Sequence, residues 1–199
     1  MASPFLDLPG EIRNQILRLL LTHTTRIITR SASQLAPPKP TPLGLSPGVL
    51  LASWRTYYEG LSILYGENTF QAHPSYLTSI VFAMEPTLTV APHHVSMVRR
   101  FHIRVRLDCD TYYDSEKVKE VFTGADELEV ELFRASWGMG GYDSLDGFVG
   151  IRGVRRARVH GSVGPKFARW LEDCMESKEG AEAGVLESDE GYDGRSLDG

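Results

Sequence analysis

Basic side chains spaced two residues apart occur in two short segments, and they are the side chains best suited to bind a charged partner. They are His102, Arg104, Arg106, Arg156 and Arg158. This spacing places them on one face of β-strands, where guanidinium groups would bind phosphate or a nucleic acid. Glu129 and Glu131 alternate in the same way between the two basic segments. If the strands are neighbours in chain order, opposite charges pair across the sheet, in ion pairs of about 0–1 kcal/mol each.

We favour this self-neutralising ladder over a nucleic-acid or phosphate site. The same outward face nevertheless remains the candidate substrate-binding surface, with His102, Arg104, Arg106, Arg156 and Arg158 as its residues. A second candidate surface is the loop at Trp137–Tyr142.

Motifs for catalysis or metal binding are incomplete in this chain. The glycines of residues 138–141 do not end in Gly-Lys-Ser/Thr, and residues 160–164 lack a Gly-x-Ser-x-Gly elbow. His93-His94 and Asp108-Cys109-Asp110 lack the spacing of a metal site. We therefore predict no catalytic residue, no metal ligand, no cofactor and no enzyme activity.

The second half of the chain alternates strands with helices. Apolar residues recur at every second position in three strand segments, centred near residues 103, 130 and 159. Helical spacing follows each of them, at residues 116–122, 145–151 and 166–175. The order predicts a small parallel sheet, or a degenerate leucine-rich-repeat-like stack, within an α/β (α+β) fold.

The first half of the chain is mainly helical. Helical spacing predicts helices at Phe5–Leu21, Leu50–Leu64 and Tyr76–Met84. Short strands are predicted at Thr24–Thr29 and Thr69–Gln71, and the prolines make residues 31–47 an irregular loop. We divide the chain into a helical region at 1–90, a strand–helix region at 95–176 and a disordered acidic tail at 177–199.

Four aromatic residues lie at helical spacing beside leucines: Trp54, Tyr57, Tyr58 and Tyr65. We expect them in the core, because aromatic side chains bury the most area per residue. Any of them that stays exposed would mark a partner surface.

Charge and cysteine content limit the classes of partner and compartment. The net charge is −5, and residues 176–199 hold eight acidic and two basic residues, so the rest is nearly neutral. Non-specific nucleic-acid binding needs a strong basic excess, which is lacking. The two cysteines, Cys109 and Cys174, read as free thiols. With no signal-peptide pattern and no apolar run of membrane-spanning length, we expect a cytosolic or nuclear protein with no membrane partner.

Two segments resemble a known family when they are taken together. Residues 8–17, Leu-Pro-Gly-Glu-Ile-Arg-Asn-Gln-Ile-Leu, resemble the opening helix of an F-box. Residues 50–59 and 64–70 are similar to a second signature of fungal F-box-like proteins. In that group an Arg-x-x-Tyr-x-Glu helix leads to a Leu-Tyr-Gly-x-Asn-x-Phe turn and strand.

The resemblance implies a non-catalytic protein-interaction module. F-boxes dock on a Skp-type adaptor of a cullin–RING ubiquitin ligase, while the C-terminal part holds a protein substrate. On this chain the adaptor-binding residues would be Leu8, Pro9, Ile12, Ile16 and Leu20. The alternative for the same stripe is that it packs into the protein's own core.

Other readings of the function remain open. An ordinary F-box has no insertion like Thr22–Val49 between its first two helices. A related scaffold without a ubiquitin role is therefore the first alternative. A nucleic-acid-binding module using the Arg-bearing strands, and a small hydrolase, are the others.

Overall fold

The computed structural model describes residues 4–23, 44–72, 94, 96–108, 114–134 and 142–184. The chain divides into two units, residues 1–73 with 79–102, and residues 74–78 with 103–199. The boundary falls inside one strand, β2 (Arg100–Arg106). The predicted strand at 24–29 and the predicted helix at 76–84 lie outside the described residues. The predicted α/β class is confirmed by helices around a four-stranded sheet.

Helix α1 (Gly10–Leu21) is shorter than predicted, because Pro9 precedes the helix and does not join it. Pro9 has φ −54° and ψ 143°, a conformation that is not helical, and residues 4–7 form turns. The prediction that the helix begins at Phe5 was therefore wrong. Proline has no N–H to donate, so its place just before the first turn costs no hydrogen bond.

The predicted helix at Leu50–Leu64 is two elements, a 3-10 helix η1 (Pro47–Leu51) and helix α2 (Trp54–Glu67). Ser53 interrupts them, because it has an extended backbone and caps α2. Its hydroxyl accepts from the Thr56 N–H at 3.1 Å, and its own N–H donates to the Thr56 hydroxyl at 3.0 Å. This reciprocal capping fixes the start of α2.

Helices α1 and α2 and the η1 segment pack closely around Gly60. A Cβ atom on Gly60 would lie 2.3 Å from Leu50 Cδ2 and 3.0 Å from Leu21 Cδ1. Only glycine leaves room for these two leucines without displacement. Leu17 and Leu21 are fully buried in this core.

Asn68 joins the ends of α1 and α2 before strand β1 (Thr69–Ala72) begins. Its buried amide donates to the carbonyls of Leu21 and Leu64, at 2.7 and 2.8 Å. Its oxygen accepts from the His23 N–H at 2.9 Å. One side chain thus satisfies backbone groups that two helix ends would otherwise leave unpaired.

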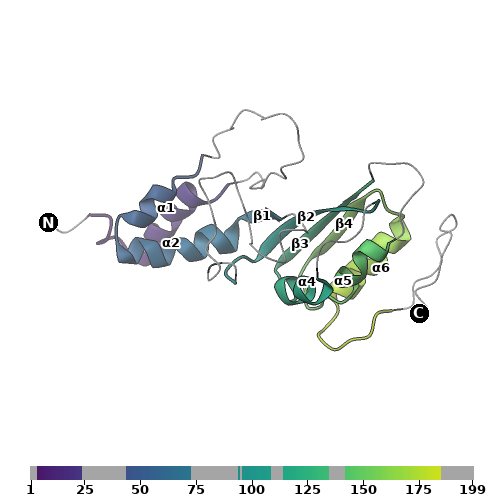
Figure 1. Cartoon of the computed structure of the whole chain (residues 1–199). Coiled ribbons are helices and arrows are strands. Elements are labelled where there is room, and N and C mark those ends of the chain that lie inside the picture. The colour runs from purple at the N-terminus through teal and green to yellow at the C-terminus, as the bar shows by residue number, and fades with distance from the viewer. Residues whose placement is uncertain are drawn as a thin grey trace. The chain divides into compact units, whose positions relative to one another are not determined.

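The strands of the sheet have the order β1-β2-β3-β4 (Figure 1). Helices connect β2 to β3 and β3 to β4 along the chain. Strands β3 (Glu127–Phe133) and β4 (Ala157–Gly161) run parallel, with Glu129 opposite Arg158 and Glu131 opposite His160. The intervening helices are α4 (Ser115–Phe122), the 3-10 turn η3 (Asp143–Leu145), α5 (Asp146–Val149) and α6 (Pro165–Glu176). The predicted order of strand and helix in this half is confirmed.

Helices α4, α5 and α6 lie along one face of this sheet, as Figure 1 shows. The strand residues on that face are buried, including Ile103, Val130 and Val159, together with Phe122 and Phe148 from the helices. The predicted helix at residues 145–151 is reduced to α5, because the backbone turns at Gly150 and residues 151–154 have no regular structure. Ile151 and Val154 still reach the core.

Glutamates from α6 occupy the free edge of β4. The Val159 N–H donates to Glu172 at 2.7 Å, and the Ala157 N–H donates to Glu176 at 2.7 Å. These bonds satisfy edge donors that would otherwise be open to another strand.

Among the described residues, no helix is both long and apolar enough to cross a membrane.

Candidate functional site

The apolar stripe predicted for adaptor docking lies on the accessible side of α1. Pro9 and Ile12 are exposed, and Leu8, Ile16 and Leu20 are half-buried. The buried side of the helix is made by Arg13, Leu17 and Leu21 instead. The alternative prediction, that the stripe is core, therefore fails for Ile12, which is 42% exposed.

Two of the four aromatic residues expected in the core lie on the surface. Trp54 is 77% and Tyr58 is 66% exposed, and their rings stack with centroids 6.1 Å apart. Tyr65 is buried as expected, and Tyr57 is half-buried. The prediction was wrong for Trp54 and Tyr58. They share a face of α2 with the buried Leu61, but they lie near the start of the helix, where the core does not cover that face. Leu51, at the end of η1, is exposed as well.

A two-pronged ion pair between Arg13 and Glu59 holds α1 against α2. Arg13 Nε and Nη2 donate to the two carboxylate oxygens of Glu59, at 3.0 and 2.8 Å. Its remaining nitrogen donates to the carbonyls of Leu6 and Leu8. The hydrogen bond from Arg13 lowers the pKa of the Glu59 carboxyl, against the opposing effect of burial. Arg55 also pairs with Glu59, at 3.2 Å.

The predicted alternation of charge across the sheet is present on the face opposite α4–α6. Arg104 pairs with Glu131 at 3.2 Å, and its guanidinium lies 4.9 Å from the ring centre of Phe133. Arg156, the residue directly before β4, pairs with Glu127 at the start of β3, at 3.2 Å. These contacts are the ladder that the sequence predicted.

The five candidate substrate-binding residues have different environments. Arg156 and Arg158 are exposed, and Arg106 pairs with Asp108 at 2.7 Å. His102 is only 3% exposed, so its imidazole cannot reach a protein partner in this conformation. His102 shares the outward strand face with the half-buried Arg100 and Arg104, so its burial, and not its face, differs from the expectation.

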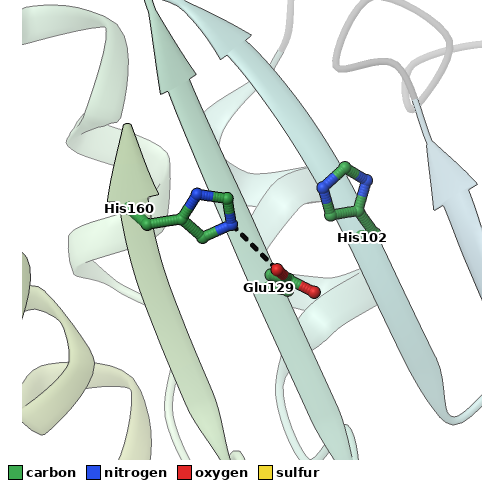
Figure 2. Close-up of side chains that lie close together, drawn as sticks. All are labelled: His102, Glu129 and His160. Atoms are coloured by element: carbon green, nitrogen blue, oxygen red, sulfur yellow. Dashed lines mark hydrogen bonds and ion pairs between the residues drawn. The ribbon is translucent and has the colours of Figure 1, made fainter. Parts of the chain in front are cut away.

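A cluster that sequence reasoning did not find lies on the same face. His102 on β2, Glu129 on β3 and His160 on β4 bring their ligating atoms within 4.8 Å of one another. His160 Nε2 lies 2.8 Å from Glu129 Oε1. Figure 2 shows Glu129 between the two imidazole rings on three neighbouring strands. The alternating pattern of the three strands was the signal that could have revealed this cluster.

Other sequence candidates contribute less. Cys174 is a free thiol, as predicted. It is also buried, and burial raises its pKa. Cys109, the loop at 138–141 and His93 lie outside the described residues. His94 stacks on Tyr65, with ring centroids 5.2 Å apart.

No family model, curated protein or solved structure matches this chain. The F-box-like resemblance therefore rests on the two sequence segments alone. In the second segment Arg55 and Tyr58 have the spacing of the Arg-x-x-Tyr-x-Glu pattern, but Glu59 lies one position earlier than the glutamate of that pattern.

Proposed function

We propose that this chain is a non-catalytic protein-interaction module, an F-box-type substrate receptor that docks on a Skp-type adaptor of a cullin–RING ubiquitin ligase. The observation that carries the proposal is the accessible apolar stripe of α1. Leu17 and Leu21 anchor the helix from its opposite side, so Ile12 and Ile16 are left for a partner. A helix that presents apolar residues one turn apart fits an apolar groove.

The exposed aromatic pair at the start of α2 supports the same proposal. Trp54 and Tyr58 are large, stacked and mostly exposed, and Leu51 adds a further exposed apolar side chain nearby in sequence. Exposed aromatic groups are enriched among the residues that carry most of the binding energy of protein interfaces. They are thus a second set of contacts within the same unit of the chain.

In this role the chain supplies position rather than bond chemistry. Other subunits of the ligase would transfer ubiquitin, and the receptor would raise the effective concentration of the substrate beside them. The exposed Arg158 is the candidate substrate-binding residue that best fits an acidic protein segment, because Arg156 pairs with Glu127. A nucleic-acid function is less well supported, because Arg104 and Arg156 already pair with glutamates.

The proposal is tested by titrating the full chain with a purified fungal Skp-type adaptor in a calorimeter. An Ile12→Asp/Ile16→Asp variant should weaken binding at least about tenfold, because it places charge in an apolar interface. Gln15→Asp is the matched control, since it adds one charge to an exposed position of the same helix, and it should bind like the parent. Circular dichroism establishes that each variant is folded.

The outcomes separate the two leading functions. The receptor function is supported if the parent and Gln15→Asp bind the adaptor and the folded double variant does not. A folded parent that does not bind the adaptor overturns the receptor and leaves an F-box-like scaffold without a ubiquitin role. If the double variant unfolds, Trp54→Ala tests the second contact surface, because Trp54 is 77% exposed and contributes little to the core.

A further inference from the structure

Three neighbouring strands each contribute one metal-ligating side chain to a single point on the sheet. His102 comes from β2, Glu129 from β3 and His160 from β4. All three ligating atoms lie within 4.8 Å of one another. The ligating residues are far apart in the sequence, since His160 and Glu129 are separated by 31 positions. Their meeting is therefore a product of the sheet and not of a local turn.

The donor set defines the class of ion that would bind. Two imidazole nitrogens and one carboxylate oxygen are the ligands of several three-residue zinc sites, in which a fourth position stays open. Mg²⁺ and Ca²⁺ prefer six or more oxygen ligands, and this cluster offers one carboxylate. The set thus favours a borderline transition-metal ion of the Zn²⁺ type.

The spacing of the donors fits such an ion after a small movement. Ligands at about 2.0–2.1 Å from a tetrahedral centre lie about 3.4 Å apart. His160 Nε2 and Glu129 Oε1 are 2.8 Å apart, and the whole set spans up to 4.8 Å. Rotation of the half-buried Glu129 and His160 side chains supplies the movement of about an ångström that remains.

The burial of His102 distinguishes this cluster from an ordinary group of surface side chains. His102 is 3% exposed, although the residues two positions before and after it on the same face are half-buried arginines. Glu129 and His160 are only half-buried, which leaves a route from solvent to the cluster.

The charges around the cluster are mixed. Arg158 lies opposite Glu129 on β4, and Arg104 is paired with Glu131 on β3. Arg100, two residues before His102, donates to the Glu67 carbonyl. These guanidinium groups oppose a purely electrostatic cation site, so binding must come from direct ligation by the imidazoles.

The geometry points to a binding site for a Zn²⁺-type ion formed by His102, Glu129 and His160. The ion would tie β2, β3 and β4 together on the face that the helices leave open. This site does not depend on adaptor binding, because none of its ligands belongs to α1 or α2.

The test uses the full chain after treatment with a chelator, titrated with ZnCl₂ in a calorimeter and with CoCl₂ by visible absorption. We expect one ion per chain, and a Co²⁺ spectrum typical of four- or five-coordination. His160→Gln and Glu129→Gln should each weaken binding at least about tenfold. Glu127→Gln, on the same strand face, and His23→Gln, which also removes one imidazole, should bind within about twofold of the parent.

Each outcome decides the proposal. A parent that takes up no Zn²⁺ overturns it, and so does equal loss in His23→Gln and His160→Gln, which would indicate binding by scattered histidines. Loss confined to the cluster variants supports it. Because His160 and Glu129 are partly exposed, their variants are expected to fold, and melting curves without metal check this. Zn²⁺ should raise the melting temperature of the parent and of Glu127→Gln, but not that of His160→Gln.

Discussion

Arg13 on α1 and Glu59 on α2 form a two-pronged ion pair, with donor–acceptor distances of 3.0 and 2.8 Å. The two residues belong to the two segments that resemble the F-box-like signatures. Arg13 also reaches back to the carbonyls of Leu6 and Leu8, so it organises the chain before α1. A charged residue on the buried side of α1 thus orients the helix and leaves its apolar stripe on the surface.

This ion pair predicts how stability depends on pH. Arg13 holds the pKa of Glu59 below its usual value in the folded chain. A lowered folded-state pKa stabilises the fold above the unfolded-state pKa, and this contribution disappears as the pH falls through the folded value. Urea unfolding between about pH 6 and about pH 3 should therefore lose stability more steeply in the parent than in Glu59→Gln. Parallel curves for the two proteins would contradict the prediction.

Asn68 is predicted to be the most sensitive polar residue in the first unit. Asn68→Ala removes two hydrogen bonds to helix carbonyls and one from the His23 N–H, and should lower the free energy of unfolding by about 2–4 kcal/mol. Asn68→Asp keeps the shape and the acceptor but loses both donors, so it should also destabilise the fold. Ser62→Ala, an exposed change on α2, is the control. Equal unfolding midpoints for the Asn68 and Ser62 variants would refute the assignment.

Gly161 is predicted to tolerate no side chain. Its φ is +104°, and a Cβ atom there would lie 2.1 Å from the Leu132 carbonyl oxygen. Gly161→Ala should destabilise the chain by about 2–4 kcal/mol, because both the backbone and the close approach to β3 resist it. Gly66→Ala is the matched control, since it lies in α2 with nothing within 4 Å of the new Cβ. Thermal unfolding of the two variants gives the comparison, and the control should be neutral or slightly stabilising.

The Cys174 thiol is predicted to react slowly. It is 4% exposed on α6, and burial raises its pKa, so little thiolate is present at neutral pH. In a Cys109→Ser background, where Cys174 is the single cysteine, labelling by a thiol reagent should follow the opening of α6. Addition of urea below the unfolding transition should then accelerate labelling. Immediate labelling of the native chain would show that the thiol is accessible.

Periodicity along the sequence predicted most of the elements that the structure describes. The alternating runs became β2, β3 and β4, and the helical runs became α1, α2, α4 and α6, because local spacing decides which face of an element is apolar. Errors occurred where a single side chain changed the backbone. Helix α1 begins after Pro9 and not at Phe5. The capping residue Ser53 divides the helix predicted at Leu50–Leu64 into two elements.

The sequence by itself determined the α/β class, the order of strands and helices and the charge alternation of the sheet, since each depends on residues close together in the chain. Only the tertiary structure decided which part of each helix is buried, because Trp54 and Tyr58 have core-like spacing but are mostly exposed in the part of the chain that the structure describes. It also decided that Arg13 meets Glu59 and that His102, Glu129 and His160 converge. Such contacts depend on how distant elements pair and pack, which local periodicity does not contain.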